Sequence, residues 1–266
     1  MLPLAIPVGV VVGAVMGALG GGGAIIAIPA LIFLLGRSPQ EATTASLVIV
    51  GLTALVGVAQ HGRAGRVRFA DGTLFALLGA AGAVLGARVA VGADPDLLLA
   101  LFAVLLLVVA RVMWTRSRPG TAQQPARDVP PWLSLRPWHL DLRRGLVVLA
   151  VASGVGLLTG FFGVGGGFAI VPALTLVLGL PMRVAVGTSL WVIALTSAVS
   201  LSARLGGGLD PDWALVAVFT VAAVAGSLAG GRAAGRTDPR LLQRGFAVLL
   251  ALVAVTTAVR SVPALF

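Results

Sequence analysis

The chain of 266 residues is 58% hydrophobic and 11% charged, and its mean hydropathy is +1.06. Ordinary soluble domains carry about a quarter charged residues, so this composition excludes a soluble enzyme and predicts a multi-pass membrane protein. The net charge of +10 comes from 19 arginines without a lysine, and in a membrane protein such residues mark loop orientation rather than a nucleic-acid surface. The lack of cysteine excludes disulfides and thiolate metal sites, and we expect no cofactor and no metal.

Six apolar segments reach the length of about 20 residues that a helix needs to cross a bilayer. They are residues 41–60, 71–92, 96–115, 184–203, 212–232 and 241–260. Two further apolar segments, 3–36 and 145–179, are too long for one span and carry a run of glycines at their middle. Because consecutive glycines are poor helix formers, each segment is expected to form two short helices. The expected helices are 4–18, 24–36, 146–160 and 167–179.

The two halves of the chain repeat each other. Residues 20–31 (GGGGAIIAIPAL) align with 163–174 (GVGGGFAIVPAL) at an offset of 143, which becomes 144 after one indel. Matched Gly, Pro and Asp-Pro positions along both halves indicate a duplication. The predicted organisation is a membrane repeat at 1–115, a cytoplasmic linker at 116–143 and a second membrane repeat at 144–266.

The positions of the arginines distinguish parallel from inverted repeats. If each long segment crosses the membrane once, the repeats are parallel and at best 12 of the 19 arginines lie on the cytoplasmic side. If each long segment is a hairpin, the repeats are inverted and 15 of the 19 lie on that side. We therefore predict an all-α integral membrane fold of two inverted-topology repeats, each a glycine-broken pair of short helices followed by three transmembrane helices.

The glycine loops predict an anion site in the middle of the membrane. Helix N-termini present free N–H groups and a partial positive charge, and glycine lets the backbone approach a ligand. The alternatives are tight helix packing for the glycines and bonding to their own helix backbone for the neighbouring hydroxyls. The predicted substrate-binding residues are Gly21, Gly22, Gly23, Ala24, Thr44, Ser46, Gly165, Gly166, Gly167, Thr188 and Ser189.

Three residues near the span ends are candidates for gating or coupling. Glu41 is also explained as a cap at a helix start, and His61 as a residue at the membrane interface. Arg204 is the repeat counterpart of His61, so a cation is kept at that rim. If transport is coupled to protons, Glu41 and His61 are the titratable groups in or near the spans.

These residues resemble the sulfite exporter TauE/SafE family of membrane permeases. The resemblance rests on residues 17–31 (GALGGGGAIIAIPAL) and 160–190 (GFFGVGGGFAIVPALTLVLGLPMRVAVGTSL). It implies a carrier in the bacterial inner membrane for sulfur-containing anions such as sulfite, sulfonates, sulfoacetate or thiosulfate. Ala24 and Ala45 stand where the second repeat has Gly167 and Thr188, so the two half-sites differ chemically.

The leading hypothesis is a secondary transporter, expected to export a small sulfur-containing anion by alternating access. A passive anion channel and a transporter of another small oxyanion or a carboxylate are the alternatives. The expected partners are the anionic substrate and the lipid bilayer but no nucleic acid, with homodimerisation and proton coupling left open. An intramembrane enzyme would need a catalytic constellation that two histidines without cysteine do not supply, and a structural subunit would leave the matched glycine breaks unexplained.

Overall fold

The computed structural model describes residues 2–90, 95–117, 142–162, 167–202 and 212–261. Within these ranges the chain is helical and contains no strand, which confirms the all-α membrane fold. The first half holds α1 (Leu2–Leu19), α2 (Gly22–Pro29), α3 (Pro39–Arg63), α4 (Phe69–Ala90) and α5 (Pro95–Arg116). The second half holds α6 (Leu142–Phe162), α7 (Gly167–Pro172), α8 (Met182–Ser202), α9 (Trp213–Arg236) and α10 (Pro239–Ser261).

The long helices coincide with the predicted membrane crossings. Five of them, α3, α4, α8, α9 and α10, are long and apolar enough to span a bilayer, and α5 is a helix of 22 residues. Most of the predicted linker at 116–143 lies outside the described residues.

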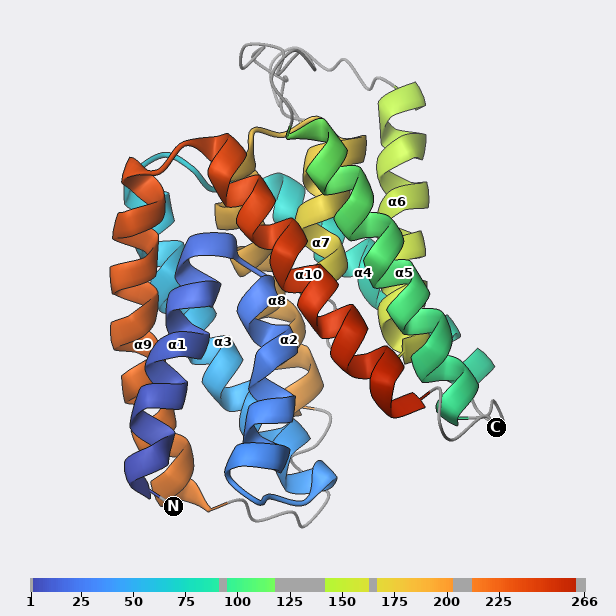
Figure 1. Cartoon of the computed structure of the whole chain (residues 1–266). Helices are drawn as coiled ribbons and strands as arrows, with labels where there is room; N and C mark the ends of the chain where they lie inside the picture. Colours follow the sequence, from blue (N-terminus) through green and yellow to red (C-terminus); the bar gives the residue numbers. More distant parts are fainter. Residues whose placement is uncertain (1, 91–94, 118–141, 163–166, 203–211, 262–266) are drawn as a thin grey trace.

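Each of the two long apolar segments is split into two helices, as the glycine runs predicted. α1 and α2 meet at Gly20, which adopts a φ of +71° that suits a residue without a side chain. Figure 1 shows α1 entering the bundle at one end and α2 returning toward the same end. In the second half α6 enters from the opposite end, and its connection to α7 lies outside the described residues.

Both returning helices widen into a π-helical turn directly after a proline. The turn Ala30–Leu34 follows Pro29, and the turn Ala173–Val177 follows Pro172. Proline has no backbone N–H, and its ring crowds the carbonyl four residues earlier, so regular α-helical hydrogen bonding is interrupted there. The sequence analysis placed the returning helices but did not predict their widening.

The first helix of each half packs along a helix of the other half. α1 lies along α9 and α6 lies along α4, and glycines bring these backbones together. A Cβ on Gly13 would overlap the backbone of Ala223, and one on Gly156 would overlap the backbone of Gly79. Gly13 and Gly156 are equivalent at the offset of 143, and Gly79 and Ala223 at the offset of 144. The repeat found in the sequence therefore reappears as matched contacts between the halves.

Equivalent helices of the two halves run in opposite directions where they meet. In the contact of α3 with α8, Gly51 lies against Ser197, whereas Gly57 lies against Leu190, which comes earlier in α8. An inverted repeat requires this antiparallel relation between equivalent helices. The orientation of the halves relative to a membrane stays a prediction.

Single cysteines at the two ends of the bundle test that orientation, because the natural chain has no cysteine. Gln40 and Arg240 are both exposed, the first after the α1–α2 hairpin and the second at the start of α10. We expect a membrane-impermeant maleimide to label the Gln40→Cys variant in intact cells and the Arg240→Cys variant only after permeabilisation. Labelling of both from the same side would support parallel repeats.

The close packing of α6 on α4 predicts that Gly156→Ala lowers the melting temperature of the purified protein. The added methyl group would overlap the backbone of Gly79, and overpacking of this kind costs about 1–3 kcal/mol. Gly154→Ala on the same helix is the matched control, since no atom lies within 4 Å of its added carbon. Equal melting temperatures for the two variants would show that the helices separate freely.

Candidate functional site

The starts of the two returning helices touch each other. A Cβ on Gly21 would overlap the carbonyl group of Gly167, and a Cβ on Gly167 would lie 3.3 Å from the Cβ of Ala24. Three residues of the predicted site, from both halves, are therefore in direct contact. Gly165 and Gly166, the other predicted glycines of the second tip, lie outside the described residues.

The two remaining predicted glycines, Gly22 and Gly23, pack within the bundle rather than against the second hairpin. Gly22 faces Leu249 of α10, and Gly23 faces Met16 of α1, where an added Cβ would overlap the side chain. Tight helix packing, the alternative explanation in the sequence analysis, therefore accounts for the lack of side chains at these two positions.

Ser189 reaches the first hairpin from the second half. Its Oγ lies 2.5 Å from the position that a Cβ on Gly20 would take, so the hydroxyl stands at the turn between α1 and α2. The same hydroxyl donates a hydrogen bond of 2.8 Å to the carbonyl of Val186 in its own helix, and Ser189 is fully buried. Its oxygen keeps lone pairs for a further donor, while its proton is used within α8.

The other predicted hydroxyls also bond to the backbone. Thr44 donates to the carbonyl of Gln40, and Ser46 donates to the carbonyl of Thr43. Thr188 accepts a hydrogen bond of 3.1 Å from the backbone N–H of Arg68 and so faces the connection between α3 and α4. These bonds correspond to the alternative weighed in the sequence analysis, in which the hydroxyls satisfy nearby backbone groups.

The sequence analysis missed the role of this connection. Arg68, whose N–H bonds to Thr188, also forms an ion pair of 3.4 Å with Asp71, which is 2% exposed at the start of α4. The signal in the sequence is the pair of opposite charges three residues apart at a helix start. The pair ties α4 to the segment of α8 that carries Ser189.

Glu41 caps the start of α3. Its backbone N–H donates to Ser38 Oγ, and its carboxylate accepts from the backbone N–H of Ser38, which together form a capping box. The capping explanation for Glu41 is confirmed. Arg204, the third gating candidate, lies outside the described residues.

His61 lies in the last turn of α3 and is buried within the bundle, while its place at the membrane interface stays a prediction. The side chain is 3% exposed and packs against the end of α1, where Nε2 lies 3.2 Å from the carbonyl oxygen of Gly17. Burial follows from the small residues around it: the Cβ of His61 lies 3.1 Å from the position that a Cβ on Gly187 of α8 would take. The sequence could not reveal this, because a histidine two residues before the end of a helix is compatible with either environment.

An ion pair joins the far end of the first hairpin to α9. Arg37 Nη2 lies 2.7 Å from Asp212 Oδ2, and Asp212 also caps α9 by accepting from the backbone N–H of Leu215. The hydrogen bond from Leu215 and the Arg37 guanidinium lower the pKa of Asp212, although desolvation opposes them. The contact stays ionised at neutral pH and restrains the loop that follows the hairpin.

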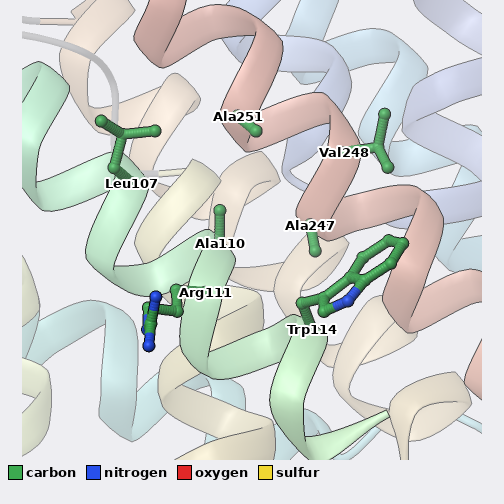
Figure 2. A pocket seen from close by; sticks show the side chains of 7 residues that line it. All are labelled: Leu107, Ala110, Arg111, Trp114, Ala247, Val248 and Ala251. Carbon is green, nitrogen blue, oxygen red and sulfur yellow. The ribbon is translucent and has the colours of Figure 1, made fainter. Parts of the chain in front are cut away.

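A groove of about 370 Å³ lies elsewhere, between α5 and α10 (Figure 2). Apart from the Arg111 and Trp114 side chains its lining is aliphatic, and none of the predicted site residues reaches it. It is therefore separate from the contact between the hairpins. The lining residues are Leu107, Ala110, Arg111, Trp114, Ala247, Val248 and Ala251.

Comparisons with known proteins agree with this architecture. The chain is 32% identical over 246 residues to a "Probable membrane transporter protein" of Xylella fastidiosa, covering 91% of this chain and 89% of the relative. It is 24% identical over 252 residues to the "Probable membrane transporter protein YunE" of Bacillus subtilis, covering 89% and 88%. No solved structure matches the chain. Residues 5–257 match the family described as "Sulfite exporter TauE/SafE", and the chain belongs to this family of membrane transporters.

Proposed function

We propose that this multi-pass membrane transporter exports a small sulfur-containing anion, such as sulfite, sulfoacetate or another organosulfonate, by alternating access. The observation that carries the proposal is the contact of Gly21 with Gly167, which brings the N-terminal ends of the two returning helices together. The family description supports the choice of a sulfur oxyanion. We place the protein in the bacterial inner membrane, with the linker in the cytoplasm.

The electrostatics of the hairpins suit an anion. Residues 17–36 and 160–179 contain no charged side chain, so the N-terminal ends of the returning helices supply the positive potential. Gly21 and Gly167 are buried at their contact, and the absence of a Cβ lets a ligand approach this backbone once the two helices move apart. The Ser189 hydroxyl, next to Gly20, adds a polar group to the same region. We assign the substrate to this region between the hairpins.

The arrangement of the hairpins suggests how access alternates. Each hairpin begins with a helix that packs on the other half, α1 on α9 and α6 on α4. Inverted repeats of this kind support two exchanged conformations in which first one hairpin and then the other is displaced from the centre. We infer that sliding along the glycine-rich contacts of α1 and α6 opens the site to one side at a time.

Flux measurements in proteoliposomes test the proposed substrate class. We expect saturable transport of sulfite or sulfoacetate that exceeds the transport of sulfate and acetate, measured with isotope-labelled anions. The proposal would be contradicted if the protein neither bound nor transported any of four anions, sulfite, sulfoacetate, thiosulfate and sulfate. Transport of acetate alone would favour the carboxylate alternative.

The same proteoliposomes separate a carrier from a channel. With a carrier, unlabelled anion trapped inside the vesicles accelerates the entry of labelled anion. The reason is that the binding site returns to the outside with anion bound, which avoids the slower return of the empty site. A channel gives an electrical conductance far above carrier turnover and no such acceleration. Conductance without counterflow would replace the transporter by the channel alternative.

The hairpin contact predicts that Gly21→Ala reduces transport at least tenfold. The added methyl group would overlap the carbonyl of Gly167 and force the hairpin tips apart. Ala24→Val enlarges the same contact from a position that already has a Cβ, so it serves as a second variant if Gly21→Ala does not assemble. Gly154→Ala on α6 is the control, and full transport by both tip variants would place the site elsewhere.

A further inference from the structure

His61 is held against the end of α1, next to the turn of the first hairpin. Its Nε2 lies 3.2 Å from the carbonyl oxygen of Gly17, and a carbonyl can only accept, so Nε2 carries a proton and donates it. Gly17 lies in the last turn of α1, three residues before the turn at Gly20, where helix carbonyls lack partners within the helix. The imidazole therefore caps α1 next to the hairpin tip.

The second ring nitrogen of His61 has no partner among the residues that the structure describes. Nδ1 is buried and makes no hydrogen bond to any part of the chain that the structure describes. With Nε2 protonated, Nδ1 holds the lone pair and is the atom that takes up a second proton. The resulting imidazolium would interact more strongly with the carbonyl end of α1, because a cation is favoured at a helix C-terminus.

Further unpaired polar atoms lie close to the same place. Gln60 donates to the carbonyl of Leu228 over 3.1 Å, but its Oε1 has no partner in the described residues. Ser227 lies along Gly17 and Gly57, and its buried Oγ is also without a partner in those ranges. Buried polar atoms of this kind are usually satisfied by water, which can also conduct a proton. The interface of α1, α3 and α9 thus has the polar groups that a water path to His61 needs.

The charged groups around His61 are mainly basic. Arg66 follows it closely and donates its backbone N–H to the His61 carbonyl, while Arg68 is paired with Asp71. On α8 the guanidinium of Arg183 donates to the carbonyl of Thr237, and α9 carries Arg232 and Arg236. α1 contributes no charged side chain, and no described carboxylate forms an ion pair with His61. An imidazolium here lacks a counter-anion from the protein itself.

We propose that His61 binds a proton that leaves the cell together with the exported anion, so that the concentration gradient of the anion drives both, an inference that rests on the proposed function. The substrate anion at the hairpin tips supplies the negative charge that the protein does not, so it favours protonation at Nδ1. By linkage, the proton favours binding of the anion to the same degree. Proton and anion therefore bind to the same conformations and cross the membrane together. Because His61 caps the carbonyl of Gly17, protonation of the imidazole changes how strongly it holds the end of α1 and thus the first hairpin.

The test compares wild type and His61→Gln in proteoliposomes loaded with a fluorescent pH indicator, using the anion that the flux measurements identify. Glutamine places an amide N–H where Nε2 donates, so it can keep the cap on Gly17, but it does not titrate. We expect the wild type to accumulate the anion along an imposed pH gradient and to carry protons with it. His61→Gln should lose at least tenfold in anion accumulation and in proton movement, whereas a saturating anion concentration should still support counterflow, because the weaker anion binding is then offset. His139→Gln, at the other histidine of the chain, should behave as the wild type.

The outcomes separate the two proposals. The role of His61 would be overturned if His61→Gln accumulated the anion and moved protons along the pH gradient at the wild-type level. It would also be overturned if transport by the wild type did not depend on the pH gradient. If the wild type shows counterflow, the transporter proposal holds whether or not His61→Gln loses its proton coupling. Absence of counterflow in the wild type would overturn the proposed function instead. His61→Ala, which lacks both the cap and the titratable group, should also lose counterflow, and intact counterflow there would show that the cap does not hold the hairpin.

Discussion

Non-helical backbone inside a membrane must be covered by protein or by water, and this constraint governs the centre of the molecule. Each hairpin has to reverse its direction, so its tip exposes N–H and carbonyl groups that lipid cannot satisfy. The start of α7 covers the first of these reversals, because Gly21 and Gly167 approach until their backbones are in contact. The second half thus buries backbone that the first hairpin exposes.

The same constraint extends to the helices that lead into the tips. α1 is packed on α9 and α6 on α4, so each hairpin is attached to the half from which it does not come. At these contacts the side chains that would keep the helices apart are missing, as at Gly13 beside Ala223 and Gly156 beside Gly79. Smooth backbone surfaces hold two helices close and offer few interlocking side chains against movement along their axes. A transporter needs both properties, since its halves must stay together while a hairpin changes position.

The sequence predicted the course of the chain well, because membrane crossing imposes a length and an apolar composition that can be read directly. The break at Gly20 followed from the run of glycines, whereas the contacts between the halves were not predicted and only afterwards proved to be related by the offsets of 143 and 144. The π turns after Pro29 and Pro172 were not predicted, since proline interrupts a helix in several ways that its sequence neighbours do not distinguish.

The site was harder to predict than the fold, because it depends on which groups are already satisfied by neighbours. Ser189, a predicted site residue, lies next to the turn of the first hairpin, but its proton is used by Val186 within its own helix. The burial of His61 against α1, beside Gly187 of α8, was not predicted. Rotamers and burial of this kind depend on contacts between helices distant in sequence, which periodicity does not reveal.

The two halves differ where His61 lies, and in the proposed mechanism this bears on how transport is driven. The repeat places Arg204 at the position of His61 and Ala83 at the position of Ser227, while Gly160 preserves Gly17. The packing glycine is thus kept in both halves, but a titratable side chain with polar neighbours occurs in the first half alone. Two identical hairpins would each carry a titratable cap, whereas in this chain protonation acts on the first hairpin. A single titratable cap makes one hairpin sensitive to protonation and leaves the other to respond to the anion, and in the proposed mechanism the linkage between these two binding events couples the proton to the anion.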